Sequence, residues 1–212
     1  MKQYVLFDLD GTIIDSAEGV INGLMFAMDH YGVKGYDRQM CMQFIGPPLR
    51  DTFELLVGEA EADAATAKYR EYYMEKGQFE CRAYDGVKEM LQRLYDEGRT
   101  LILATSKFQA LAESILERLG LRELFAYISG NDPLRADKTA VMRHALEIAG
   151  VEDRSLAVMV GDRKYDVDGS KAVGIECIGV LYGFGQRDEL MRHGVDYHAE
   201  TTEKVADLVL KL

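Results

Sequence analysis

Short apolar runs alternate along much of this chain with longer segments in which apolar residues recur every three or four positions. A short apolar run bounded by a turn signal predicts a strand buried on both faces of a sheet, whereas the longer recurrence predicts an amphipathic helix. Glycines close several of the periodic segments, as expected at helix ends. The predicted strands are 4–7, 100–105, 127–129, 156–162 and 175–180, and the helices predicted beside them are 84–96, 109–119, 138–149 and 165–173.

Residues 16–82 follow a different pattern, because apolar residues recur there at helical spacing and no segment convincingly predicts a strand. Elsewhere the alternation of strands and helices indicates right-handed βαβ units and a parallel sheet. The fold prediction is therefore a doubly wound α/β core formed by residues 1–14 and 84–212, with residues 15–83 inserted as a helical cap domain. The helices predicted in the insertion are one from Ser16 to about 31, a short one after Asp37, one over 49–57 and the longest over 59–80.

Two acidic residues stand where the first predicted strand ends, since the apolar run 5–7 leads directly into Asp8 and Asp10 before Gly11 breaks it. The carboxyl ends of parallel strands are where open α/β sheets place their ligands. Residues two apart in an extended chain point the same way, so the two carboxylates should converge. That arrangement is unfavourable unless a cation lies between them or one is protonated. Acids that only cap the next turn are the alternative.

The segment from Phe7 to Ser16, with the sequence FDLDGTIIDS, resembles the opening motif of the haloacid dehalogenase superfamily. It is most similar to the branch of small phosphatases that includes phosphoglycolate phosphatase and 5′-nucleotidase-like enzymes. The resemblance implies a Rossmann-like core with a helical cap inserted after the first strand. It also implies that Asp8 is a nucleophile that forms an aspartyl phosphate and that Asp10 is the general acid and base.

Two further positions match the second and third motifs of that superfamily. Thr105 and Ser106 come at the end of a predicted strand, where a hydroxyl and backbone N–H groups can hold phosphate oxygens; a hydroxyl that caps the next helix is the alternative. Lys138 lies at a predicted helix start, a position unfavourable to the helix dipole and compatible with a functional role. The resemblance implies that Lys138 neutralises the nucleophile and the phosphate, and a solvated surface lysine is the alternative. Many relatives have Lys-Pro where this chain has Lys138-Thr139.

Asp162 ends another predicted strand, and Asp166 follows four residues later, on one side of the next predicted helix. The segment GDRKYD resembles the superfamily's fourth motif, Gly-Asp-x-x-x-Asp. The resemblance implies a metal site formed by Asp8, the backbone carbonyl of Asp10 and Asp162, with Asp166 orienting a metal-bound water or Lys138. An oxygen-only donor set predicts Mg²⁺ rather than zinc. Capping of the helix is the alternative role of these acids.

The chain of 212 residues carries 25 basic and 36 acidic side chains, for a net charge of −11. This excess argues against nucleic acid or an anionic membrane as a partner, and it means that a phosphate substrate must be attracted locally. Cys41, Cys81 and Cys177 are widely spaced without a Cys-x-x-Cys, which indicates reduced thiols and no zinc site. With no basic-then-apolar leader and no apolar run of ~18 residues, we expect a cytoplasmic protein that is a monomer or a weak dimer.

Together these features predict a Mg²⁺-dependent phosphatase that hydrolyses a small phosphate monoester, phosphoglycolate-like or nucleotide-like, through an aspartyl phosphate. A sugar-phosphate mutase on the same core and a non-catalytic phosphate-binding module are the alternatives. Asp10 argues against dehalogenation, which dispenses with a second aspartate. Substrate choice would come from residues 16–82. There Arg50 follows the helix breaker 46–48 and is a candidate for contact with an anionic substrate, a surface arginine at a helix corner being the alternative.

Overall fold

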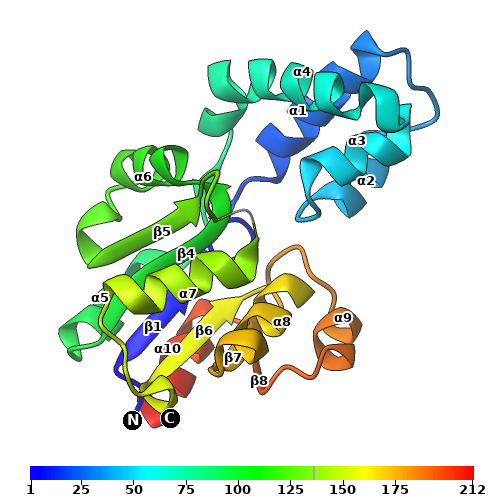
Figure 1. Ribbon diagram of the computed structural model, residues 1–212. Coiled ribbons are helices and arrows are strands. Elements are labelled where there is room, and N and C mark those ends of the chain that lie inside the picture. Colours follow the sequence, from blue (N-terminus) through cyan, green and yellow to red (C-terminus); the bar gives the residue numbers. More distant parts are fainter. Residues whose placement is uncertain (136) are drawn as a thin grey trace. The chain divides into compact units, whose positions relative to one another are not determined.

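The computed structural model describes residues 1–135 and 137–212. The chain forms two compact units (Figure 1). The sheet unit comprises Met1–Ile14 and Ala83–Leu212, and the helical unit comprises Asp15–Arg82. Among the described residues, no helix combines the length and the apolar character that crossing a membrane requires.

A six-stranded parallel sheet forms the centre of the sheet unit, in the order β5-β4-β1-β6-β7-β8. From β1 the chain builds one half of the sheet and then returns to build the other, as doubly wound folds do. The prediction of a doubly wound parallel sheet is confirmed. The strands are β1 (Tyr4–Phe7), β4 (Thr100–Phe108), β5 (Tyr127–Asn131), β6 (Ala157–Gly161), β7 (Glu176–Val180) and β8 (Tyr197–Ala199).

Helices cover both faces of this sheet. They are α5 (Val87–Asp96), α6 (Gln109–Arg118), α7 (Lys138–Ile148), α8 (Lys164–Val173), α9 (Arg187–Arg192) and α10 (Thr202–Lys211), with the 3₁₀ turns η4 (Arg122–Leu124) and η5 (Arg154–Leu156). Helices α7 and α8 lie over one face, and α5 and α10 over the other (Figure 1). Leu6, Ile102 and Met159 from the strands join Met142 of α7 and Val167 of α8 in one buried apolar cluster. Because helices bury both faces, the strands appear in the sequence as unbroken apolar runs.

Some elements of the sheet unit differ from the predictions. The elements α9, β8 and α10 were not predicted; α9 and β8 have 6 and 3 residues, too few for a hydrophobic period to stand out. Strand β4 continues past its predicted end at Thr105 to Phe108, and its register with β5 shifts between Ala104 and Phe108. Since Leu103 pairs with Phe7, this irregular part of β4 lies beside the residues that follow β1.

The helical unit is built from α1 (Ala17–His30), α2 (Arg38–Cys41), α3 (Leu49–Val57) and α4 (Ala62–Glu75), with the 3₁₀ turns η1 (Met42–Phe44), η2 (Glu59–Glu61) and η3 (Gly77–Phe79). The prediction of one long helix over 59–80 is wrong, because η2, α4 and η3 share that segment. The break has a packing reason: a Cβ on Gly19 would lie 2.0 Å from the Gly77 carbonyl oxygen, so the two backbones meet only through glycine.

The chain passes between the two units at Ile14–Asp15 and at Arg82–Ala83. These two segments are the strands β2 and β3, and they form a separate two-stranded sheet. No strand was predicted in either place. Each strand has only two residues, which is too short for an alternating pattern to be recognised in the sequence.

Candidate active site

The end of β1 and the turn after it place two acids at the carboxyl edge of the sheet. The Asp8 N–H donates to the Val160 carbonyl oxygen at 2.9 Å, which continues the pairing with β6 for one residue past the strand. Gly11 has a φ of 80°, a conformation that glycine adopts at little cost. A Cβ at this position would lie 2.2 Å from Asp162 Oδ2. Any side chain at Gly11 would therefore displace Asp162.

Asp8, Asp162 and Asp166 form one cluster, in which an oxygen of each carboxylate lies within 4.8 Å of the others. They come from the residue after β1, the residue after β6 and the first turn of α8. Lys138, the first residue of α7, places Nζ 2.8 Å from Asp8 Oδ1 and 2.8 Å from Asp166 Oδ1. Lys138, Asp162 and Asp166 are buried. The structure thus brings together four residues that the sequence had assigned to the site, from four separate elements.

Burial dominates the electrostatics of this acid cluster. It raises the pKa of Asp8 to about 6, with the Lys138 ammonium opposing the shift and the Asp166 carboxylate adding to it. Burial, together with Asp166 and Asp8, also raises the pKa of Asp162 well above its ordinary value. For Lys138 burial acts to lower the pKa, but the Asp166 and Asp8 carboxylates outweigh it and the net shift is upward. One charged ammonium therefore pairs with two of the three carboxyl groups of the cluster, those of Asp8 and Asp166.

The donor set of the cluster fits a divalent metal ion. Asp162 Oδ1 is buried and accepts no hydrogen bond from the described residues. Its other oxygen, Oδ2, accepts from the backbone N–H groups of Phe184 at 2.8 Å and Gly185 at 3.2 Å, which fixes the carboxylate. The unpaired oxygen and its carboxylate neighbours supply oxygen atoms only, which is the set that Mg²⁺ prefers. A divalent cation there would also reduce the repulsion among the three acids.

The loop after β7 holds Asp162 in place, although it was not among the predicted parts of the site. A Cβ at Gly183 would lie 2.2 Å from the Gly11 carbonyl oxygen, and one at Gly185 would lie 1.7 Å from the Asp162 carbonyl oxygen. Only residues without a side chain allow the loop to approach this closely. The signal available in the sequence was a pair of glycines, two positions apart, just after a predicted strand.

Asp166 has two roles in the structure. Its Oδ2 accepts a hydrogen bond from the Arg163 N–H at 3.0 Å and so caps the start of α8. Its Oδ1 pairs with Lys138 Nζ. One oxygen of the carboxylate therefore contacts the start of α8 and the other contacts Lys138, while its role in orienting Lys138 stays a prediction.

The side chain of Asp10 contacts a second lysine instead of the acid cluster. Asp10 Oδ2 lies 3.0 Å from Lys107 Nζ, and the Lys107 side chain is only 9% exposed. Lys107 was not among the predicted site residues, although a basic residue directly after Thr105 and Ser106 was visible in the sequence. The carboxyl edge of the sheet therefore holds two lysines beside its four acids, and these ammonium groups offset part of the local negative charge that would repel a phosphate.

Thr105 and Ser106 lie in the irregular part of β4. Thr105 is buried, and its Oγ1 accepts a hydrogen bond from the Lys107 N–H at 3.1 Å, whereas Ser106 is exposed. Contact of either residue with phosphate stays a prediction. Ala136, which belongs to the segment around the predicted lysine motif, lies outside the described residues.

Arg50 lies in the helical unit, in the first turn of α3. Its guanidinium lies 2.7 Å from Glu54 Oε2 and 3.1 Å from Asp63 Oδ1, and its side chain is 45% exposed. Exposed pairs of this kind contribute little to stability, so the guanidinium can exchange these partners at little cost. Its contact with an anionic substrate stays a prediction.

Known proteins resemble the chain along almost its whole length. Residues 5–180 match the family model of haloacid dehalogenase-like hydrolases. A 5′-nucleotidase of Pseudomonas aeruginosa is 39% identical over 193 residues, 89% of this chain and 87% of that protein. Tyrosine-protein kinase PtkA of Mycobacterium tuberculosis is 34% identical over 210 residues, 97% of this chain and 72% of that protein. The crystal structure of a predicted phosphatase from Clostridium acetobutylicum has a TM-score of 0.94 at 36% identity and covers 100% of both chains.

These similarities bear out the resemblance first seen in the motif that contains Asp8 and Asp10. The family model spans all the acids of the cluster and the lysine that contacts them. The relatives named as a nucleotidase and a phosphatase support the prediction of a phosphoric monoester hydrolase, which is confirmed at the level of enzyme class. The chain belongs to the haloacid dehalogenase-like hydrolases.

Proposed function

We propose that this protein is a Mg²⁺-dependent phosphatase that hydrolyses a small phosphate monoester, phosphoglycolate-like or nucleotide-like, through an aspartyl phosphate on Asp8. One observation carries the proposal. The Asp8 carboxylate stands at the carboxyl end of the central strand, 2.8 Å from the buried ammonium of Lys138 and within the same cluster as Asp162 and Asp166. A carboxylate in that place has both the position and the charge compensation that attack on a phosphate requires.

In the first half of the reaction, an oxygen of Asp8 attacks phosphorus in line with the leaving group. A bond forms between Asp8 and phosphorus while the bond from phosphorus to the leaving oxygen breaks. Lys138 offsets the repulsion between the carboxylate and the phosphate as they approach. Asp10 gives a proton to the leaving oxygen, so that the product departs as an alcohol. Thr105 and neighbouring backbone N–H groups hold the equatorial oxygens.

In the second half, Asp10 takes a proton from a water molecule, and the water oxygen attacks phosphorus while the bond to Asp8 breaks. Lys107 keeps Asp10 in place through their ion pair. Asp8, the backbone carbonyl of Asp10 and Asp162 would hold Mg²⁺, with Asp166 orienting Lys138. When bound, the ion neutralises charge on the acids and on the phosphate. Phosphate and the alcohol are the products, and the enzyme is regenerated.

A screen of small phosphate esters tests this proposal. We expect purified protein with Mg²⁺ to release inorganic phosphate from p-nitrophenyl phosphate and to prefer some members of a panel that includes phosphoglycolate, nucleoside monophosphates and sugar phosphates. The Asp8→Asn variant, purified in parallel, is the blank for contaminating phosphatases. Transfer of phosphate between positions of a sugar without its release would identify a mutase instead. Binding of phosphate without turnover of any ester would contradict the proposal.

Asp162 and Asp166 should contribute unequally to metal binding. Asp162 has an unpaired buried oxygen, whereas both oxygens of Asp166 have partners within the protein. We therefore expect Asp162→Ala to weaken Mg²⁺ binding more than Asp166→Ala, as measured by isothermal titration calorimetry and by Mg²⁺ activation. Asp168→Ala, also on α8 but exposed and paired with His193, is the matched control and should bind Mg²⁺ like the wild type. The opposite order of the two cluster variants would exclude this assignment of the ligands.

The raised pKa of Asp8 predicts that the pH profile of kcat/KM has an acid limb, in which kcat/KM falls as the pH is lowered. A pKa of about 6 means that the proton is held up to a higher pH than usual, so the nucleophilic carboxylate is lost as the pH falls through that value. We expect kcat/KM to fall about tenfold per pH unit below the pKa. Because Mg²⁺ competes with the proton for the same oxygens, raising its concentration should move the limb to lower pH. A limb that stays at the same pH at every Mg²⁺ concentration would argue against Asp8 as both nucleophile and ligand.

A further inference from the structure

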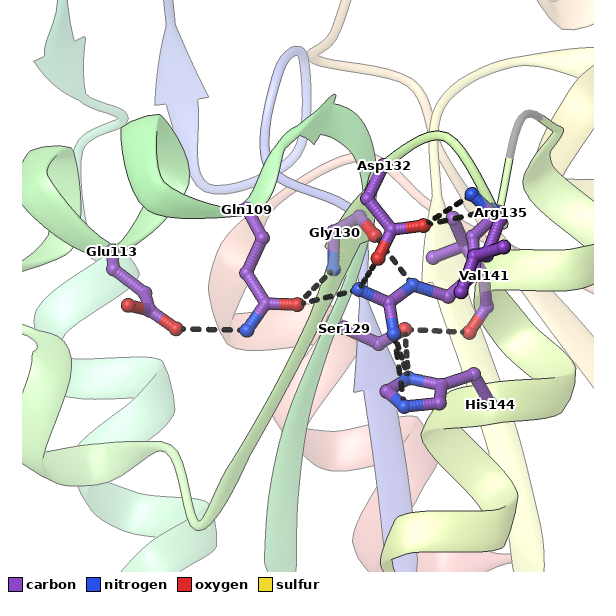
Figure 2. Close-up of polar contacts among 9 residues, drawn as sticks. Gln109, Glu113, Ser129, Gly130, Asp132, Arg135, Val141 and His144 are labelled. Atoms are coloured by element: carbon purple, nitrogen blue, oxygen red, sulfur yellow. Dashed lines mark hydrogen bonds and ion pairs between the residues drawn. The ribbon is translucent and has the colours of Figure 1, made fainter.

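A polar network that includes residues of α7, the helix that begins at Lys138, has no part in the proposed mechanism. It joins the end of β5, the start of α6 and the middle of α7, and Figure 2 shows the guanidinium of Arg135 at its centre. Arg135 lies three residues before Lys138, in the segment that links β5 to α7. The Arg135 side chain is only 17% exposed. A nearly buried guanidinium so close in sequence to Lys138 requires an explanation.

Each nitrogen of the Arg135 guanidinium faces an acceptor. Nη2 lies 2.5 Å from Asp132 Oδ2 and donates to Gln109 Oε1 at 3.0 Å. Nε donates to the Gly130 carbonyl oxygen at 3.1 Å. Nη1 lies 2.9 Å from His144 Nε2. These four partners belong to the linking segment, α6, β5 and α7, so one planar group ties four parts of the sheet unit together.

His144 contacts Arg135 as a neutral acceptor. The Ser129 hydroxyl donates its proton to the Val141 carbonyl oxygen at 2.8 Å and has none left for the imidazole. His144 Nδ1 lies 2.9 Å from Ser129 Oγ, and Arg135 Nη1 lies near both ring nitrogens, 3.2 Å from Nδ1 and 2.9 Å from Nε2. Burial, and after it the Arg135 charge, lowers the pKa of His144 and so favours the neutral imidazole. Glu147 and Asp132 act in the opposite direction.

The other partners are oriented in advance as acceptors. Gln109 donates through Nε2 to Glu113 Oε1 at 3.1 Å, which turns its carbonyl oxygen toward Arg135 (Figure 2). Asp132 Oδ1 accepts from the backbone N–H groups of Leu134 at 2.8 Å and Arg135 at 2.9 Å, so the carboxylate closes the turn that carries Arg135. The network is thus arranged around one guanidinium, and removing that group would leave several half-buried acceptors without their shared donor.

The segment that Arg135 fixes leads directly into the start of α7. Asp137 caps that helix by accepting from the Ala140 N–H at 2.8 Å, and Lys138 is its first residue. Lys138 Nζ contacts Asp8 and Asp166 at the same time, and the position at which this helix begins determines whether it can do so. We propose that Arg135 is a positioning residue that anchors the start of α7 and thereby places Lys138 against the nucleophile. The inference rests on the proposed function, since it assigns Lys138 its role in phosphate transfer.

The test compares Arg135→Ala, Arg135→Lys and the control Arg93→Ala, whose guanidinium is exposed and pairs with Asp207 on the surface. A displacement of about 1 Å at a reacting group costs up to about a hundredfold in rate, so we expect kcat of Arg135→Ala to fall about 10- to 100-fold while KM changes less than about twofold. Guanidinium ion at tens of millimolar should restore part of kcat in this variant and have no effect on Arg93→Ala. Arg135→Lys, which keeps the charge without the planar fork, should be intermediate.

Two further measurements distinguish failure of this inference from failure of the proposed function. In a Lys138→Met background, adding Arg135→Ala should lower kcat no further, because the group that it positions is gone. Urea unfolding of the four proteins of this cycle gives a coupling between the two residues that needs no activity. Full additivity in both measurements, or a loss of kcat that guanidinium does not restore, would overturn the inference. If Arg135→Ala does not fold, Arg135→Lys in the same cycle decides. A wild type without turnover would contradict the proposed function, while the unfolding cycle would still test the positioning.

Discussion

Replacing Asp8 with asparagine should abolish turnover while leaving the fold intact. The amide has the shape of the carboxylate but cannot attack phosphorus, so we expect a loss of at least ~10³-fold in kcat. The structure indicates that the fold tolerates the change. Burial raises the pKa of Asp8 to about 6, which means that its charged form is held unfavourably in the folded state. Lys138 would still pair with Asp166.

Steady-state kinetics at saturating Mg²⁺ and urea unfolding measure the two halves of this prediction. Asp207→Asn is the matched control, because it makes the same chemical change at an exposed acid that pairs with Arg93. The control should keep its activity. Residual turnover of Asp8→Asn above a few per cent of wild type, with deamidation excluded by mass spectrometry, would show that another residue is the nucleophile.

Removing the Lys138 ammonium should damage both stability and activity. Lys138→Met keeps most of the side-chain volume but leaves Asp8 and Asp166 buried without their shared cation. Breaking a buried ion pair from one side typically costs ~3–5 kcal/mol, and uptake of a proton by Asp8 would reduce that loss. The rate should fall further for two reasons. Asp8 would be protonated to a higher pH, and the phosphate would lose a donor whose removal is typically worth ~10²–10³ in kcat.

A second buried lysine provides the control for this variant. Lys2 is 6% exposed, pairs with Glu176 Oε2 at 2.5 Å and lies before β1, at the amino end of the strand that Asp8 follows. Lys2→Met should therefore lose stability without losing kcat. The free energy of unfolding and kcat are measured for both variants at pH 7 with and without Mg²⁺. Equal losses of kcat in the two variants would show that Lys138 acts only through stability.

Features read from strand ends were predicted well from the sequence. The unbroken apolar runs before Asp8 and before Asp162 identified two neighbouring strands of the sheet, and parallel strands end at one edge. Lys138 was found because a lysine is unfavourable at a helix start and because it matches the third motif of the superfamily that the chain resembles. In these cases a local sequence pattern was enough to predict a contact between residues far apart in the sequence, because the fold class determines where each strand or helix ends.

Other parts of the site depend on contacts that no local pattern encodes. The donors that fix Asp162 are backbone N–H groups of Phe184 and Gly185, and a backbone donor has no side-chain type by which the sequence could identify it. The partners of Arg135 are spread over the chain from Gln109 to His144, so their meeting follows only from the packing of α6, β5 and α7. The break of the long predicted helix at Gly77 likewise depends on backbone contact with Gly19.

Trapping the covalent intermediate is the most direct test of whether Asp8 is the nucleophile. The enzyme is mixed with a good substrate and Mg²⁺, quenched during turnover and reduced with borohydride, which converts an aspartyl phosphate to homoserine; peptide mass spectrometry then locates the change. We expect homoserine at position 8 and nowhere else, and none in Asp8→Asn treated in parallel. Phosphate found on a hydroxyl such as that of Thr105 or Ser106, or turnover with no modified residue in any quenched sample, would contradict the account.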